Sequence, residues 1–173
     1  MINSLGSPQK FLREVFEYLD SKGIDCSAYH LDHLCYRLES THKYLQLKNE
    51  FSSEHSLIKE SLVNGRPIAV FKISESIVFT EPNAQNGIKR NIEILELPSP
   101  KKGANYKEGW EHVEFVIDEP LEKFLKRHAK LQFDLKGLSK TINKEVRLKS
   151  EKFSIKFHEK SLLDIIQIEQ GKQ

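Results

Sequence analysis

The sequence has few of the features that mark several specialised protein classes. It has only two cysteines, Cys26 and Cys35, so it does not read as a disulfide scaffold. No apolar run approaches the roughly 18 residues of a membrane span, and the N-terminus lacks the basic and then apolar order of a secretory signal. The net charge is only +2, with lysines and acids interspersed. We therefore expect a cytoplasmic protein with reduced thiols and with no nucleic-acid or membrane partner.

Several catalytic and cofactor-binding motifs are also missing. The sequence contains no Gly-x-Gly-x-x-Gly or Walker loop, no His-Glu-x-x-His or Cys-x-x-Cys motif, and no serine-centred nucleophile elbow. What is present is an ordinary globular composition, with 38% hydrophobic and 30% charged residues among 173. A chain of this length can bury a core of its own as one domain or as two fused halves.

The hydrophobic pattern predicts both helices and strands. Ser7-Pro8 is a typical helix start and Gly23 a typical stop. Further helices are expected after Ser40, after Pro120 and from Ser161 to Glu169, and a loop is expected over residues 81–90. Strands are predicted at residues 31–39, 55–63, 66–73, 76–80, 92–97, 111–118, 145–149 and 152–158, with a hairpin turn at Asn64-Gly65.

The first predicted strand has a counterpart in the second half of the chain. Asp32 to Glu39 and Glu111 to Asp118 both read acid, His, apolar, variable, aromatic, variable, apolar, acid, and each is followed by a helix and strands. Repetition of a whole supersecondary unit predicts two pseudo-symmetric halves. His33 and His112 would then face each other inside a cup, as members of a shared site. Two separately solvated histidines are the alternative.

Five segments carry a resemblance to a known family: residues 31–39, 64–68, 94–100, 108–117 and 154–158. From Leu31 onward the chain resembles the YecM-type proteins of the vicinal oxygen chelate superfamily, which includes glyoxalases, bleomycin-resistance proteins and dioxygenases. The resemblance implies an α+β fold in which paired β-α-β-β-β modules form a cupped, barrel-like mixed sheet. We expect an N-terminal helical extension at 1–30 and a short C-terminal helix. The modules would cover 31–100 and 101–173 of one fused domain.

The same resemblance implies a metal site between the modules. Superfamily members usually take their ligands from the first and last strands of each module, which here implies His33, His112 and Glu96. Two imidazoles and a carboxylate suit a divalent ion such as Zn, Fe, Ni or Mn and leave positions open for substrate oxygens. The usual final-strand glutamate is missing, because the segment 154–158 offers Lys156 and His158 instead. A three-ligand site is therefore expected.

Other residues on the polar faces of the strands are candidates for catalysis or substrate binding beside the ion. Glu114, two residues beyond His112, is a candidate catalytic base, an additional ligand or a hydrogen-bond partner of a ligand. Arg37 suits a substrate carboxylate, or it pairs with a neighbouring acid. Lys156 and His158 are candidate substrate-binding residues, with a solvated strand edge as the alternative, above all for Lys156.

Three functions remain open at this point. The first is a metal-dependent isomerase, lyase or dioxygenase-type enzyme that acts on a small oxygen-containing molecule. The second is a non-catalytic module of the same fold that binds or sequesters a small ligand. The third is a scaffold with a vestigial site. Because the repeat can supply a complete site within one chain, both a monomer and a homodimer are compatible with the sequence.

Overall fold

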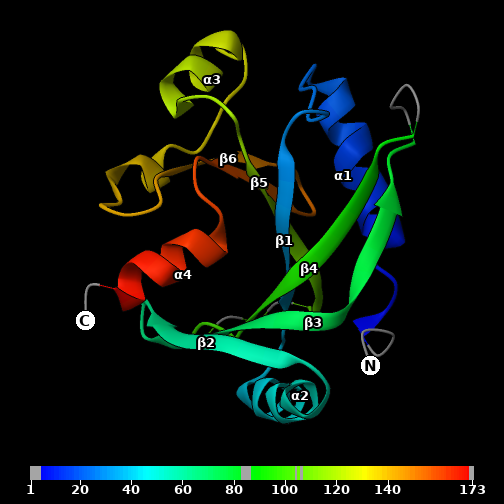
Figure 1. The fold of residues 1–173 in the computed structure, drawn as a ribbon, viewed down its shortest axis with the longest axis vertical. Helices are drawn as coiled ribbons and strands as arrows, with labels where there is room; N and C mark the ends of the chain where they lie inside the picture. The colour runs from blue at the N-terminus through cyan, green and yellow to red at the C-terminus, as the bar shows by residue number, and fades with distance from the viewer. Residues whose placement is uncertain (1–4, 83–86, 104, 106, 172–173) are drawn as a thin grey trace.

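The computed structural model describes residues 5–82, 87–103, 105 and 107–171. Within them lie helices α1 (Gln9–Ser21), α2 (Thr41–Glu54), α3 (Leu121–Arg127) and α4 (Leu162–Gln170). The strands are β1 (His30–Arg37), β2 (Ser56–Val63), β3 (Arg66–Thr80), β4 (Lys89–Pro98), β5 (Gly109–Val116), β6 (Glu145–Lys149) and β7 (Ser154–His158). These strands form one mixed sheet in the order β2-β3-β4-β1-β5-β7-β6, which curves into an open cup (Figure 1). The expected α+β class and cupped sheet are confirmed.

Local sequence signals account for several element boundaries. Ser40 caps α2 by accepting a hydrogen bond from the backbone N–H of Lys43, and Ser161 forms a capping box with Asp164 at the start of α4. Asn64 and Gly65 have positive φ values of 52° and 77°, as a tight hairpin turn between β2 and β3 requires. The predicted caps at Ser40 and Ser161 and the hairpin are therefore confirmed, whereas α1 begins at Gln9, with Pro8 rather than Ser7 at the N-cap position and no side-chain cap.

The segment from residue 66 to residue 90 differs from the prediction. The two strands expected at 66–73 and 76–80 are one continuous strand, β3, whose pairing with β4 shifts register between Lys72 and Ile77. The polar residues at this shift interrupt the alternation without ending the strand. Lys89 and Arg90 belong to β4 rather than to the expected loop, of which residues 83–86 lie outside the described part of the chain.

The second unit has one strand fewer than the expected β-α-β-β-β pattern. The first unit runs β1-α2-β2-β3-β4, whereas the described residues of the second run β5-α3-β6-β7. In place of a counterpart to β2, Asp134 makes an isolated bridge to Arg147 of β6, and a 3-10 helix follows at Lys136–Ser139. The segment 135–144 is rich in lysine and contains Gly137, so it lacks the apolar alternation of a strand.

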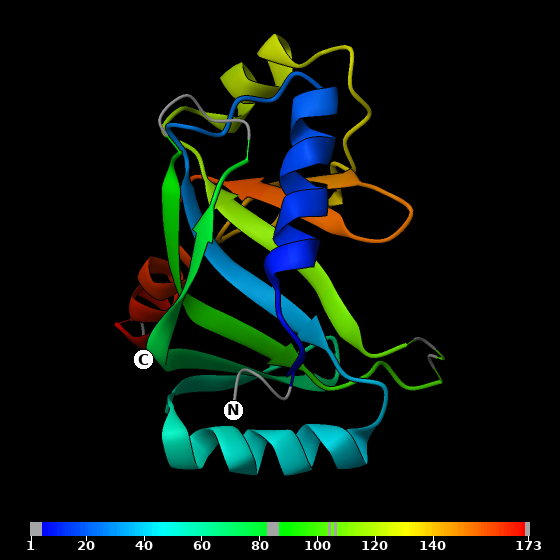
Figure 2. The same cartoon turned by 90° about the vertical axis from the view of Figure 1, so that its right-hand side faces the viewer.

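The two faces of the sheet have different coverings (Figure 2). Helices α1, α2 and α3 pack on the convex face, where one core cluster includes Leu12, Phe16, Leu34, Phe51, Phe115, Phe124 and Phe157. Helix α4 instead lies on the concave side, where Ile166 packs with Val70 and Ile94. No helix in the described residues is long and apolar enough to cross a membrane. Because α4 covers only part of the concave face, the rest of that face is available to polar side chains.

The two histidine strands meet at the centre of the sheet. Strands β1 and β5 are antiparallel neighbours, with His33 opposite Glu114 and Cys35 opposite His112. Because His33 corresponds to His112 in the repeat, and Cys35 to Glu114, these two cross-strand pairs are equivalent. An approximate two-fold rotation thus relates the backbone of β1 to that of β5. It brings the rings of His33 and His112 to a centroid separation of 6.3 Å.

Candidate metal centre

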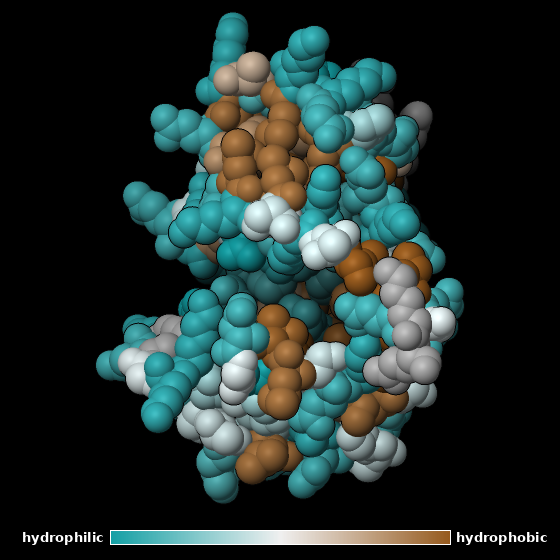
Figure 3. Space-filling view, turned by 90° about the vertical axis from the view of Figure 1, so that its left-hand side faces the viewer, coloured by the Kyte–Doolittle hydropathy of each residue, from teal (hydrophilic) through white to brown (hydrophobic). Residues whose placement is uncertain are grey.

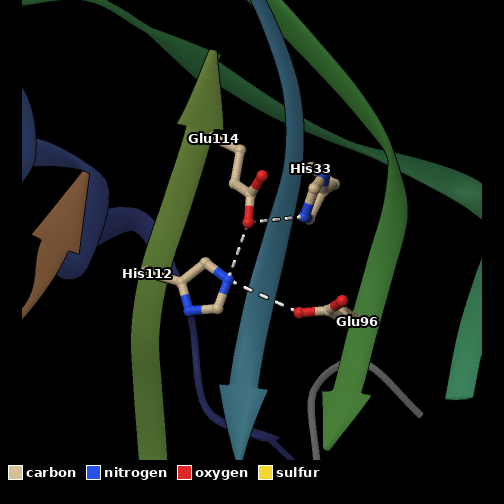
Figure 4. Close-up of side chains that lie close together, drawn as sticks. All are labelled: His33, Glu96, His112 and Glu114. Atoms are coloured by element: carbon tan, nitrogen blue, oxygen red, sulfur yellow. Dashed lines mark ion pairs between the residues drawn. The ribbon is translucent and has the colours of Figure 1, made fainter. Parts of the chain in front are cut away.

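Four side chains from three adjacent strands converge on the floor of the cup (Figure 4). They are His33 of β1, Glu96 of β4, and His112 and Glu114 of β5, and their ligand atoms all lie within 4.8 Å of one another. The Nε2 atom of His112 is 3.4 Å from Glu96 Oε2 and 3.1 Å from Glu114 Oε1. The Nε2 atom of His33 is 3.3 Å from the same oxygen of Glu114. The arrangement therefore presents two imidazole nitrogens and two carboxylates to one point.

Each of these histidines has an acidic partner on its other ring nitrogen. His33 Nδ1 lies 2.8 Å from Asp32 Oδ2, and His112 Nδ1 lies 3.4 Å from Glu111 Oε2. Since a carboxylate only accepts, Nδ1 of His33 carries the hydrogen and Nε2 is directed at the cluster. An irregularity in β1 between Leu31 and His33 accompanies this contact between neighbouring residues. A carboxylate that fixes the ring of a histidine in this way is typical of metal sites.

Asp32 is itself held in place by the C-terminal helix. Its Oδ2 atom accepts a hydrogen bond of 3.0 Å from the backbone N–H of Leu162, the first residue of α4. The positive end of a helix stabilises a carboxylate at this position. Helix α4 therefore orients His33 through Asp32, although it contributes no side chain to the cluster of four.

The electrostatics of the cluster favour an added positive charge. Burial alone would lower the pKa of His33, but Glu114 and Asp32 raise it to about 10. Burial would raise the pKa of Glu96, but the hydrogen bond from His112 and the nearby Lys156 lower it to about 2. The pKa of Glu114 is likewise held well below its usual value, against the effect of burial, by Lys156 and His33. The buried carboxylates therefore hold Lys156 and the ring of His33 in their positively charged forms, and a divalent cation that binds here would take the place of a histidine proton.

The residues present fit a divalent ion. The buried Nε2 atom of His33 lies 3.3 Å from Glu114 Oε1 but makes no hydrogen bond, which is costly for a polar atom unless a ligand binds it. Nitrogen and carboxylate oxygen form a donor set that Zn²⁺, Fe²⁺, Ni²⁺ and Mn²⁺ all accept. Cys35 is buried beside His112, and burial raises the pKa of its thiol to about 11, which makes it a poor ligand and nucleophile.

A cavity of about 1070 Å³ opens from this cluster (Figure 3). Its floor includes His33, Glu96, His112 and Glu114. The lining from β3 and α4 includes the apolar residues Ile68, Val70, Ile165 and Ile166 together with Arg66 and Glu169, while the lining around β6 is charged and includes Lys136, Lys140, Arg147 and Lys149. The volume suits a small molecule, and the two parts of the lining differ in chemistry.

The structure brings together the three ligands that the resemblance implied. Glu96 points toward His112, whereas Glu93, three residues earlier, lies on the other face and pairs with Lys72 on the surface. Glu114 lies in the same group of four converging side chains. Arg37 lines the same cavity, and its Nε donates to the backbone carbonyl of Lys107 at 3.2 Å.

Two residues of the final strand lie differently from the prediction. Lys156 lines the cavity, as expected of a ligand-binding residue, but it is nearly buried and contacts Glu114 and His112. His158 is completely buried and is absent from the cavity lining, so it cannot touch a ligand there. Its Nδ1 donates to the carbonyl of Lys160 at 2.5 Å, and its Nε2 lies 3.3 Å from Glu114 Oε2. His158 therefore lies beneath the cavity, away from the surface position expected of a substrate-binding residue.

Sequence reasoning missed Asp32 and Glu111 as partners of the histidines. The signal was present, because each histidine follows an acidic residue at the same position of the repeat. Regular strand alternation places neighbouring side chains on opposite faces, so it gave no reason to pair an acid with the next residue.

Comparisons with known proteins agree with the fold. The family model described as YecM protein matches residues 3–169. Protein YecM of Escherichia coli is 26% identical over 177 residues, which cover 94% of this chain and 90% of that protein. An uncharacterized protein of Haemophilus influenzae is 28% identical over 107 residues, which are 62% of this chain and 52% of that protein.

Two solved structures have a similar fold. The structural-genomics protein EC4020 has a TM-score of 0.75 and 24% identity, and the match covers 97% of this chain and 92% of that chain. A hypothetical protein from Bacillus halodurans C-125 has a TM-score of 0.51 and 16% identity, with 77% of this chain and 95% of that chain covered. Since the family model spans nearly the whole sequence, the chain belongs to the YecM family.

Proposed function

We propose that this protein binds one divalent metal ion in its cup and uses that ion to hold a small oxygen-containing ligand, as in the vicinal oxygen chelate superfamily. One observation carries the proposal: the donor atoms of His33, Glu96, His112 and Glu114 lie within 4.8 Å of one another. Two imidazoles with one or two carboxylates suit Zn, Fe, Ni or Mn and leave coordination positions on the cavity side.

The metal ion and the residues around the cavity would have separate roles. A bound divalent ion would supply Lewis-acid chemistry, which suits a carbonyl or enolate in an isomerase, lyase or dioxygenase-type reaction. Asp32 and Glu111 orient the histidines, and Arg37 offers a guanidinium to an acidic group of the ligand. The isoleucines of the lining, such as Ile68 and Ile166, would pack against apolar parts of the ligand.

The contacts of Glu114 favour a second candidate, a non-catalytic ligand-binding module of the same fold. Its carboxylate lies beside Nε2 of His33, His112 and His158 and contacts the ammonium group of Lys156. Both oxygens are therefore engaged, which suits a ligand or an anchor better than the catalytic base expected from the sequence. In this second function, a small molecule stabilises the protein without turnover.

Metal titration of the chelator-treated protein tests the proposal. We expect one ion to bind per chain and to raise the free energy of unfolding by about 2.7 kcal/mol when its concentration is about 100 times the Kd. Isothermal titration calorimetry and thermal melting with Zn²⁺, Mn²⁺, Ni²⁺ and Fe²⁺ measure these two quantities. If none of the four ions binds or stabilises the folded protein, the proposal is wrong.

Replacement of Asp32 by asparagine tests the role of the acidic partner. Asparagine keeps the size and still accepts a hydrogen bond, but it removes the negative charge that fixes the ring of His33. We expect metal affinity to fall about 10- to 100-fold, the usual effect of changing a partner of a metal-bound histidine. Asp25→Asn is a suitable control, because Asp25 lies in an exposed turn with Ser27. Equal affinities of both variants and of the unmodified protein would argue against this role.

A further inference from the structure

The repeat places Lys156 at the position that Glu96 holds in the first unit. In the first unit, the residue two positions beyond the histidine of β1 is Cys35, which pairs with Glu96 of β4. In the second unit, the residue two positions beyond the histidine of β5 is Glu114, which pairs with Lys156 of β7. The two pairings are equivalent, so an ammonium group stands where pseudo-symmetry would put a third carboxylate beside Glu96 and Glu114.

The ammonium group of Lys156 occupies the space that a metal ion would need. It contacts Glu114 Oε1 and lies 3.2 Å from Nε2 of His112, so it engages two of the four ligand atoms. A protonated lysine has only donors and cannot bind a metal. A cation at the centre of the cluster and the present position of Lys156 therefore exclude each other.

The charge around Lys156 explains why it can be buried there. Burial would lower its pKa, but the carboxylates of Glu114, Glu96 and Glu145 raise it. Only 9% of the residue is exposed, and a buried charge persists in a protein when it is paired. Lys156 also lines the cavity, so its flexible side chain has open space into which it can move.

We propose that Lys156 is a built-in competitor for the metal. Its ammonium group neutralises the carboxylates while the centre is empty and withdraws into the cavity when a divalent ion enters, so that it sets the metal affinity. This inference rests on the proposed metal binding. It also gives Lys156 a role in the empty protein, where it holds Glu114 and His112 together.

Two substitutions test the competitor role. Lys156→Met removes the charged end group and keeps the rest of an unbranched side chain, so Zn²⁺ should bind about 10- to 100-fold more tightly, the effect of removing one charge-assisted hydrogen bond. Lys156→Glu supplies a third carboxylate to the cluster, and its affinity for Zn²⁺ should be at least as high as that of Lys156→Met. Lys149→Met is the control, because Lys149 lines the same cavity but pairs with Asp134 at 2.6 Å. Calorimetric titration with Zn²⁺ measures all four proteins.

The metal-free proteins provide a second readout. Without a metal, Lys156→Met should melt at a lower temperature than the unmodified protein, because Glu114 loses its cationic partner. Saturating Zn²⁺ should then raise the melting temperature of Lys156→Met by more than that of the unmodified protein. Unchanged or weaker Zn²⁺ affinity in folded Lys156→Met would overturn the competitor role while leaving the metal site in place. If no protein in the set binds a divalent ion, the proposed function itself fails.

Discussion

The double variant His33→Ala His112→Ala is expected to bind divalent metal more than about 100-fold less tightly than the unmodified protein. This loss exceeds the loss expected from removing one hydrogen-bond partner of a metal-bound histidine. The substitutions remove both nitrogen donors and leave only Glu96 and Glu114. Two carboxylates without imidazole discriminate poorly among Zn²⁺, Ni²⁺ and Fe²⁺. The dissociation constant, measured by competition with a chromogenic chelator, is the decisive quantity.

A matched pair of histidines provides the control. His30→Ala His42→Ala also removes two imidazoles, but both of these residues are exposed and neither belongs to the cluster. Its metal affinity should equal that of the unmodified protein. Circular dichroism of all three proteins establishes that the fold is intact. Equal losses in the two double variants would place the binding nitrogens outside the cup.

Arg90→Met is expected to lower the free energy of unfolding by about 3–5 kcal/mol, the range for breaking a buried ion pair. Nε of Arg90 donates to Glu81 at 2.5 Å, and its terminal nitrogens donate to the carbonyls of Tyr29 at 2.5 Å and Cys26 at 2.7 Å. Methionine fills most of the volume but makes none of these hydrogen bonds. Glu81 and the Tyr29 carbonyl would then lose the donor that Arg90 provides, and the Cys26 carbonyl would keep only the backbone N–H of Tyr29.

Chemical denaturation with urea measures this loss directly. The neighbouring variant Lys89→Met alters an exposed side chain of the same strand and should change the free energy of unfolding by less than about 0.5 kcal/mol. Arg90→Lys keeps the charge but loses the planar fork, so its stability should lie between the two. A loss below about 1 kcal/mol in Arg90→Met would mean that the network is worth no more than an exposed ion pair.

The repeat was the part of the structure that the sequence predicted best. Alternation and the shared pattern around His33 and His112 placed both histidines on one face, because strand periodicity leaves little freedom when the opposite face is apolar. Glu96 needed the family resemblance, since alternation alone does not decide which of Glu93 and Glu96 faces the cup. The structure then agreed with that choice.

Other parts of the site depend on contacts that no local pattern encodes. Burial of His158 follows from its pairing with Val116 and Glu145 on neighbouring strands and from the loop at Lys160. The contact of Asp32 with His33 accompanies an irregularity in β1, and its contact with Leu162 joins residues 130 positions apart. In its described residues the second unit has one strand fewer than the first, and the lysine-rich segment found there instead was left unassigned by the sequence pattern.

The approximate two-fold symmetry at the centre of the sheet holds for the backbone but not for the side chains. Cys35 and Glu114 occupy equivalent positions in the two halves, and so do Glu96 and Lys156. Each half thus contributes one histidine and one carboxylate to the cluster. In the first half they come from two strands, β1 and β4, whereas in the second half both come from β5. Only the second half adds an ammonium group. A molecule that enters the cup meets two unlike sides. We expect such a pocket to hold an unsymmetrical guest in one orientation and to distinguish mirror-image forms of it.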